Sequence, residues 1–323
     1  MAPAMFVLSF QTTFLATLQI LFLGAVGYFL VKRGIVDEDG LRLFSRLIIN
    51  LFLPSFIFSQ LLGNFRFELY PNWWIFPILS FAVTLIGFLV SQLVFLLNKN
   101  KIPFKKEFVA LVAFQNSGYL PLILVATLFS SQQAQILYVY IFLFLIGFDL
   151  ILWSWGVKVL AHHSPEKFEL KNLTHSPVAA IVVSLFMVWV GLEKIVPSVI
   201  LKPIKMLGDC TLPLAMIVMG GNLARLESLE KRPSGLSLVM MTKLIVLPLI
   251  ASIVVLILRV DFLVGFLFVL EAAVPSAISL SVIAHHYRAE ENFINQALFW
   301  GHLMCIFTLP VFLMFYTRLR GTW

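Results

Sequence analysis

A short polar stretch in the first half of the chain, residues 114–121 with the sequence FQNSGYLP, carries the residue types best suited to binding a small molecule. It lies inside an apolar segment, residues 108–129, that is long enough to cross a bilayer. The proline removes an amide donor and clashes with the preceding turn, so the helix is expected to break here. Backbone opened at that depth persists only where protein covers it or where it lines a watery cavity. The candidate binding residues of this stretch are Asn116, Ser117, Gly118 and Pro121.

The expected position of this break suits an anion. Asn116 lies ten residues past Lys106, which at about 1.5 Å per residue is roughly 15 Å deep, near the middle of a hydrocarbon core about 30 Å thick. A half-helix that starts there presents free N–H groups with a positive dipole end, which attract a carboxylate. Hydrogen bonding between helices is the commonest role of polar residues in membrane spans and is the alternative interpretation.

The second half of the chain repeats the pattern at residues 271–276, with the sequence EAAVPS. Pro275 interrupts another apolar segment, and Ser276 and Ser279 follow it. We expect these three residues to line the site from the opposite side. Glu271 is a carboxyl group near the midplane, so it must be neutral, paired or exposed to water. It could carry a proton or bind a cation, or in its protonated form it could simply bridge helices.

Other ionisable residues in apolar segments have weaker claims to function. Asp149 is the second candidate for proton or ion coupling, and the alternative is that it is a structural partner of Lys243. Lys243 could equally extend its long side chain to the interface. An intramembrane aspartyl protease using Asp149 and Asp209 would need a Gly-x-Gly-Asp sequence, which is not met here. Paired proline breaks would also stay unexplained, so an enzyme is not favoured.

Proline interrupts two further apolar segments, in the sequences NLFLP (50–54) and DCTLP (209–213). Paired proline breaks in two halves of a chain indicate the transport site of a membrane carrier. The polar residues beside these prolines are expected to support the broken backbone rather than to touch a substrate. The residues assigned this role are Asn50, Pro54, Asp209 and Pro213.

Composition identifies a polytopic membrane protein. Of the 323 residues, 60% are hydrophobic and only 12% are charged, and the mean hydropathy is +0.98. The net charge of +7 is spread over short loops, so it reports membrane topology rather than nucleic-acid binding. Two isolated cysteines and three histidines, His285, His286 and His302, show no ligand spacing, so no metal is expected. No phosphate-binding glycine loop is present, so no cofactor and no ATP drive are expected.

Ten apolar segments divide the chain into two halves of five, which predicts an all-α polytopic protein. Residues 1–160 form a first five-span repeat, 161–176 a cytoplasmic linker, and 177–323 a second repeat. Lysine and arginine are more frequent in the loops of one side, which places both termini outside. An odd number of spans in each half makes the repeats inverted. The segments are 10–31, 41–62, 73–97, 108–129, 135–160, 177–192, 199–223, 236–258, 262–285 and 293–316.

Together, these motifs resemble the auxin efflux carrier family, which holds the plant PIN-FORMED carriers and many bacterial relatives. The pieces that carry the resemblance are FQNSGYLP at 114–121, Asn50 with Pro54, LPLA at 212–215 with Gly220, and VPS at 274–276. The likeness covers essentially the whole chain.

The resemblance implies ten transmembrane helices in two inverted repeats, with helices four and nine crossing at their broken midpoints. It also implies secondary transport of a small organic anion, such as malate, malonate or an auxin-like carboxylate, by an elevator-type movement. The drive would be the substrate gradient, the membrane potential or protons. A homodimer in the plasma membrane is a further implication, while a sensor or channel built on the carrier fold is the alternative function.

Overall fold

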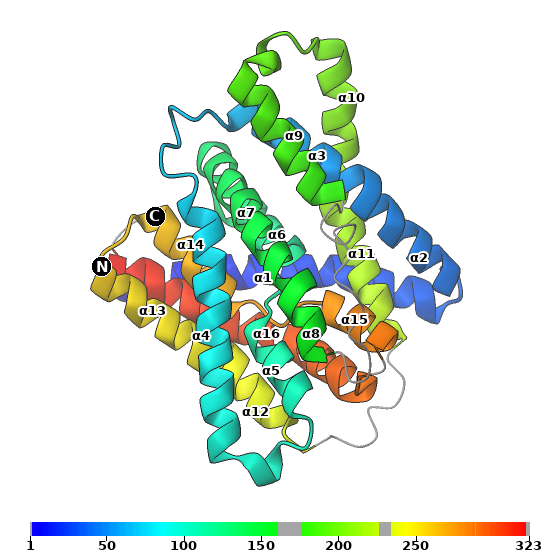
Figure 1. Ribbon diagram of the computed structural model, residues 1–323, viewed down its shortest axis with the longest axis vertical. Helices are drawn as coiled ribbons and strands as arrows, with labels where there is room; N and C mark the ends of the chain where they lie inside the picture. The colour runs from blue at the N-terminus through cyan, green and yellow to red at the C-terminus, as the bar shows by residue number, and fades with distance from the viewer. Residues whose placement is uncertain (1, 161–175, 226–233, 288, 321–323) are drawn as a thin grey trace.

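The structure is a computed structural model that describes residues 2–160, 176–225, 234–287 and 289–320. These residues form helices and no strands (Figure 1). Six helical stretches are long and apolar enough to cross a membrane, and shorter apolar helices lie among them. The helical class predicted from sequence is confirmed, whereas the division into ten inverted spans is not established by these lengths.

The first half consists of one long helix, several helices joined by short irregular turns, and one clearly broken helix. Its elements are α1 (Ala2–Lys32), α2 (Glu38–Leu47), η1 (Ile48–Phe52), α3 (Leu53–Asn64), α4 (Ile75–Leu97), η2 (Lys99–Lys101), α5 (Lys105–Ala113), α6 (Tyr119–Leu128), α7 (Ser131–Ile151), η3 (Leu152–Gly156) and α8 (Val157–Leu160).

The second half also contains one clearly broken helix and ends in one long helix. Its elements are α9 (Ser176–Val190), η5 (Leu192–Lys194), α10 (Ser198–Asp209), α11 (Thr211–Ala224), α12 (Leu236–Met241), η6 (Thr242–Val246), α13 (Leu247–Leu258), α14 (Phe262–Ala273), α15 (Ser279–Tyr287) and α16 (Glu291–Arg320). The linker predicted at residues 161–176 lies almost entirely outside the described residues.

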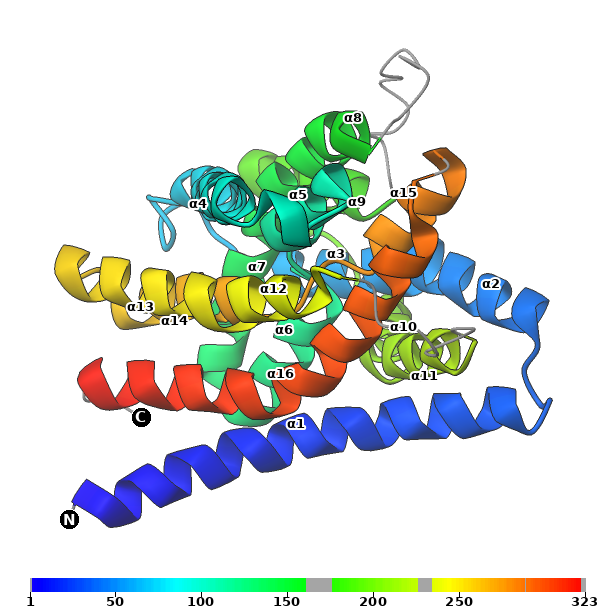
Figure 2. The same ribbon diagram turned by 90° about the horizontal axis from the view of Figure 1, so that it is seen from below.

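Helices from the two halves are packed against each other. α1 lies along α11 and also contacts α16, and it borders one side of the molecule (Figure 2). α3 packs against α9 and α10, while α4 contacts α5 and α7. The start of α1 and the end of α16 lie at the same end of the molecule (Figures 1 and 2).

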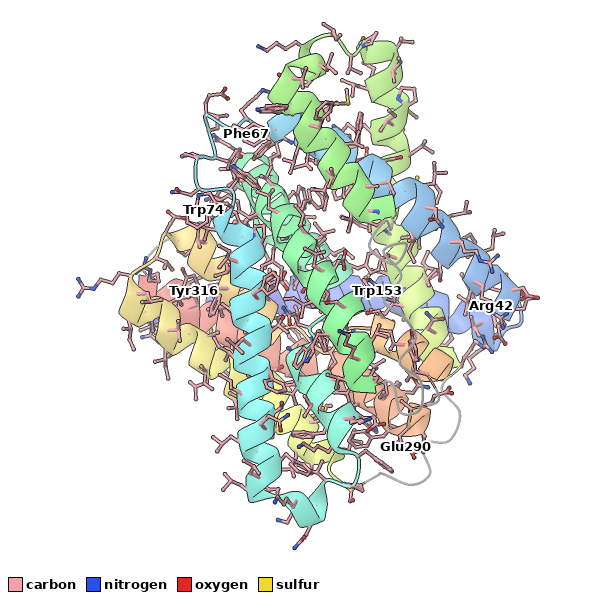
Figure 3. The ribbon with its side chains drawn as sticks, in the orientation of Figure 1. Arg42, Phe67, Trp74, Trp153, Glu290 and Tyr316 are labelled. Carbon is pink, nitrogen blue, oxygen red and sulfur yellow. The ribbon has the colours of Figure 1, made fainter. Side chains whose placement is uncertain are left out.

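Side chains tie the ends of these helices together. The Tyr316 hydroxyl, labelled in Figure 3, donates a hydrogen bond to the Phe262 carbonyl oxygen at 2.8 Å and so joins α16 to the start of α14. The Glu38 carboxylate at the start of α2 pairs with Arg42, also labelled there, and with Arg225 after α11. The bonds of Tyr316 and Arg225 link helix ends that are far apart in the sequence.

The interruption predicted at Pro54 is different in the structure. The helix continues through it, because the π turn η1 immediately before α3 accommodates the missing amide donor. The Asn50 side-chain nitrogen donates to the Arg46 carbonyl oxygen at 3.0 Å, within the same helix. Asn50 and Pro54 therefore support a π turn and not a broken backbone.

The interruption predicted near Pro213 is also small. Only Cys210, which itself has helical backbone angles, separates α10 from α11. Pro213 then lies in the first turn of α11, where a missing N–H costs nothing. Asp209 and Pro213 are both exposed. Neither residue supports an open backbone in this structure.

Candidate functional site

Two broken helices meet at their breaks in the middle of the molecule. The first break, residues 114–118, separates α5 from α6, and the second, residues 274–278, separates α14 from α15. Gln115 and Ser276 form an isolated antiparallel bridge between these stretches. The sequence therefore located both breaks correctly, and the structure shows that they pair.

Backbone hydrogen bonds hold the two breaks together. The Asn116 amide nitrogen donates to the Pro275 carbonyl oxygen at 2.8 Å, and the Ala277 amide nitrogen donates to the Phe114 carbonyl oxygen at 3.0 Å. Backbone groups left unpaired in a membrane interior would cost several kcal/mol each. Each break therefore satisfies part of the other's backbone, which explains how unwound chain persists at this depth.

The Ser276 hydroxyl adds a third link across the breaks. It is buried and donates a hydrogen bond to the Leu111 carbonyl oxygen at 2.5 Å. In a continuous helix that carbonyl would accept from the amide of residue 115, so the serine replaces a bond that the break removes. Ser276 thus has a structural role at the position predicted to line the site.

The Asn116 side chain is held by a histidine from α16. Its Nδ2 atom lies 3.1 Å from Nε2 of His302, and Nδ1 of His302 lies 2.8 Å from the Leu298 carbonyl oxygen. Asn116 is 6% exposed and His302 is 4% exposed, so water competes little for either group. Sequence reasoning considered His302 only as a metal ligand and missed this contact.

Several buried polar atoms at the breaks have no hydrogen-bond partner in the described part of the chain. These atoms are both side-chain heteroatoms of Gln115, together with the Ser117 hydroxyl and both carboxyl oxygens of Glu271, which lie near each other but have no other partner. Buried polar groups are nearly always paired, so a cluster without partners points to bound water or ligand. Gln115 was not selected from the sequence, although it stands in the same polar stretch.

Lys243 completes the site from η6. It is 1% exposed and attracts Glu271, which is itself fully buried close to the Ser117 hydroxyl. The long side chain is therefore buried in the protein. Its electrostatic neighbour is Glu271, and no interaction with Asp149 is found in the described residues. The isolated lysine inside an apolar segment was the signal available in the sequence.

The remaining predicted site residues lie at the helix ends or farther away. Gly118 precedes α6 without a side-chain cap, and Pro121 is buried in the first turn of that helix. Ser279 is the half-buried first residue of α15. Asp149 is half-buried in α7 and interacts electrostatically with Tyr119 at the start of α6. It borders the breaks but makes no ion pair in the described residues.

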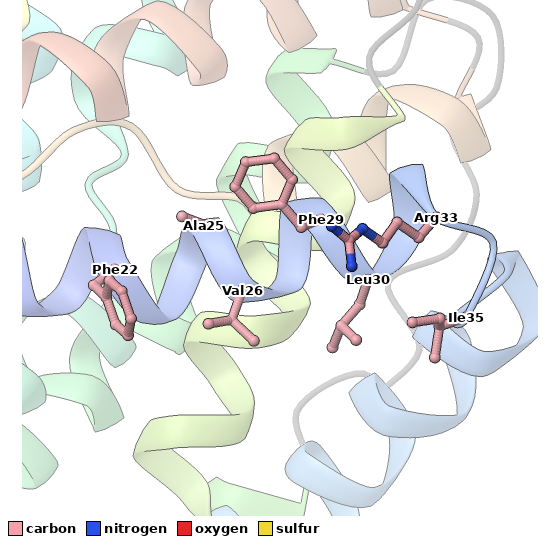
Figure 4. Close-up of a pocket in the computed structure, with 7 residues that line it drawn as sticks. All are labelled: Phe22, Ala25, Val26, Phe29, Leu30, Arg33 and Ile35. Atoms are coloured by element: carbon pink, nitrogen blue, oxygen red, sulfur yellow. The ribbon is translucent and has the colours of Figure 1, made fainter.

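A surface groove of about 360 Å³ lies elsewhere, along α1 (Figure 4). Its lining is apolar except for Arg33, and it comes from α1 and the turn after it. The groove therefore lacks the converging polar groups of a binding site. Within the described residues no three His, Cys, Asp or Glu side chains gather as metal ligands. The side chains of His285 and His286 lie outside that description.

Helices broken at their midpoints in both halves of a chain are typical of membrane transporters, where unwound backbone is covered by protein or lines a cavity. Comparison with known proteins agrees. A family model described as "Membrane transport protein" matches residues 12–313. The chain belongs to this family, the auxin efflux carrier family, and is an integral membrane transporter, not an enzyme.

Individual relatives are distant. Protein PIN-LIKES 2 of Arabidopsis thaliana is 30% identical over a match that covers 34% of this chain and 24% of that protein. Protein PIN-LIKES 5 of the same plant is 21% identical, with 91% of this chain and 94% of the plant protein covered. An uncharacterized transporter of Methanocaldococcus jannaschii is 25% identical, with 87% and 91% covered.

Proposed function

We propose that the protein is a secondary transporter for a small organic anion, a carboxylate or dicarboxylate such as malate or malonate, or an auxin-like acid. The observation that carries this proposal is the cluster of buried polar atoms on Gln115, Ser117 and Glu271 where the two broken helices cross, which have no hydrogen-bond partner in the described residues beyond one another. Such a cluster favours a polar ligand or water at that place.

The helix ends beside this cluster suit a carboxylate. α6 and α15 both begin next to the crossing. The first-turn N–H groups of a helix carry partial positive charge. No side chain caps α6, so its free donors remain available to a ligand. Asn116, Ser117 and Ser279 would add side-chain hydrogen bonds, and Lys243 would add a positive charge nearby.

Coupling to an ion is assigned to Glu271 and Asp149, as predicted from the sequence. Glu271 is fully buried, and Lys243 is the cation that attracts it. A proton or cation that binds Glu271 would free Lys243 to attract the substrate anion. Coupled movement of a proton and an anion would follow from that competition.

The transport cycle proposed is of the elevator type, carried out by ten helices in two inverted repeats, residues 1–160 and 177–323. The two crossing breaks would move as one unit, because the backbone bonds between them join opposite halves of the chain. The proposal also includes a homodimer in the plasma membrane with both termini outside.

Uptake into liposomes tests this function directly. The purified protein is reconstituted, and uptake of labelled malate, malonate and indole-3-acetate is followed with and without a pH gradient. Saturable uptake of one of these anions by the wild type, lost in Asn116→Ala, is the expected result. A pH dependence of uptake that is weaker in Glu271→Gln than in the wild type would support proton coupling at that residue.

Two other results would count against parts of the proposal. Uptake that does not change with pH or with the Glu271→Gln substitution would rule out a role for Glu271 in proton coupling. The proposed binding site would be unaffected by that result. An absence of saturable uptake for all three anions would reject the proposed substrate class.

A further inference from the structure

The hydrogen bonds of His302 determine its tautomer. Nδ1 lies 2.8 Å from the Leu298 carbonyl oxygen, which has no hydrogen to donate, so Nδ1 must carry the proton. In the neutral ring Nε2 is then an acceptor. It lies 3.1 Å from Nδ2 of Asn116, which donates to it.

This bond controls which atom Asn116 offers to a ligand. The amide nitrogen is directed toward His302, and Oδ1 accepts no hydrogen bond within the described residues. An amide oxygen can only accept hydrogen bonds, so it repels a carboxylate. With a neutral histidine, Asn116 therefore opposes the class of ligand that the nearby helix ends attract.

Protonation of His302 would reverse that preference. Imidazolium donates from both nitrogens, so Nε2–H would then face the donor Nδ2 of Asn116. A half-turn of the amide places Oδ1 on Nε2–H and restores the hydrogen bond. The same half-turn directs the NH₂ group into the site, where it can donate to a carboxylate.

We infer that His302 is a positioning residue that couples anion binding to proton uptake, by setting the orientation of the Asn116 amide. The inference rests on the proposed anion transport and deepens it. One proton passes from solution to Nε2 of His302 for each carboxylate bound at Asn116. The two charges offset each other, so this half of the cycle adds no net charge to the membrane interior.

The elements packed against α16 carry other ionisable groups, including Lys243 and Glu271 of the same site. α16 packs against α1, α5, α12, α13, α14, α15 and η6. In the described residues, the imidazole hydrogen bonds are those to Asn116 and Leu298, and it makes no ion pair. The described ionisable side chains on these elements are Tyr28 and Lys32 of α1, Lys105, Lys106 and Glu107 of α5, Lys243 of η6, Glu271 of α14, Tyr287 of α15, and Glu291, Cys305, Tyr316, Arg318 and Arg320 of α16.

Calorimetry of the full-length protein in detergent tests the inference. Binding of malate, malonate and indole-3-acetate is measured between about pH 5 and pH 8, where imidazole ordinarily titrates. Two buffers with different ionisation enthalpies then give the number of protons taken up. The variants are His302→Gln, Glu271→Gln and, as a matched control on the same helix, Cys305→Ser, whose thiol donates to the His302 backbone carbonyl oxygen and bonds no other group in the described residues.

The expected result follows from the thermodynamic linkage between anion binding and proton uptake. In the wild type and in Cys305→Ser, affinity falls by up to about tenfold per pH unit as the histidine loses its proton. In His302→Gln one proton fewer is taken up for each anion bound, because a glutamine amide can accept or donate without gaining a proton. Glu271→Gln keeps the proton taken up by His302 and loses only a proton that Glu271 itself binds, which gives a second readout if His302→Gln does not fold.

The outcomes separate this inference from the proposed function. Proton uptake on anion binding that is unchanged in His302→Gln, or that disappears entirely in Glu271→Gln, would overturn the role of His302 and leave anion transport standing. No binding of any of the three anions by the wild type would overturn the proposed function, and the inference with it.

Discussion

The Asn116 amide nitrogen and the Pro275 carbonyl oxygen are joined by a 2.8 Å hydrogen bond, so two breaks from opposite halves of the chain form one unit. This bond belongs to the backbone and not to the asparagine side chain. The part of Asn116 that holds the structure together is therefore separable from the part that can contact a ligand.

Replacing Asn116 by alanine should weaken anion binding by about tenfold to a hundredfold while the protein stays folded. The substitution keeps the backbone bond and removes a hydrogen bond to a charged group, worth about 1.5–3 kcal/mol. Binding measurements in detergent and uptake into liposomes check this. The matched control is Asn98→Ala, whose side chain bonds the Val94 carbonyl oxygen in α4. Equal loss in both variants would contradict a binding role for Asn116.

Replacing Ser276 by alanine should destabilise the crossing by about 1–3 kcal/mol, since it leaves the Leu111 carbonyl oxygen unpaired in a buried place. Thermal unfolding in detergent measures the effect. Ser252→Ala is the matched control, because that serine is equally buried but bonds the Pro248 carbonyl oxygen of its own helix. An unfolding temperature lowered less by Ser276→Ala than by Ser252→Ala would refute the link between the breaks.

Much of the fold follows from apolar length and proline position. The apolar segment predicted at 236–258 coincides with the stretch from α12 to α13, and both breaks fall where Pro121 and Pro275 suggested. The helix resumes at Tyr119, two residues before Pro121, because a proline is tolerated in a first helical turn. The break predicted at Pro54 is absent, since a π turn can accommodate a proline without interrupting the helix.

The contacts of the site were not predictable in the same way. Asn116 interacts with His302, and Lys243 interacts with Glu271. The two members of each pair lie on different elements, and packing over the whole molecule sets how those elements are rotated toward each other. Sequence spacing gives the depth of each polar residue in its own span but not the face that it turns to a neighbour. The residue types were visible, whereas their partners were not.

Replacing Gly220 by alanine should disrupt the packing of α11 on α1. A Cβ atom there would stand 1.7 Å from the Gly24 carbonyl oxygen, so the helices would have to separate. We expect a loss of stability of at least about 1–3 kcal/mol, typical of overpacking. Gly63→Ala in α3 is the control, since no atom lies within 4 Å of its added Cβ and alanine favours helix. Thermal unfolding should lower the transition for Gly220→Ala alone, and equal transitions would show that the close approach is not required.

Lys243 and Glu271 should behave as a coupled pair. The two buried side chains interact electrostatically. Removing one of two buried, mutually compensating charges commonly costs about 3–5 kcal/mol, because the other charge is left without compensation. Lys243→Met and Glu271→Gln should each destabilise the protein, and the double variant should be less destabilised than the sum of the two by at least about 1 kcal/mol. Denaturant unfolding in detergent gives the three values.

The control cycle pairs Lys243→Met with Glu107→Gln in place of Glu271→Gln. Glu107 is a buried carboxyl group on α5 that accepts a hydrogen bond from the Glu290 amide nitrogen. That control should be additive within about 0.5 kcal/mol. Additivity in the first cycle as well would show that Lys243 does not compensate the Glu271 charge.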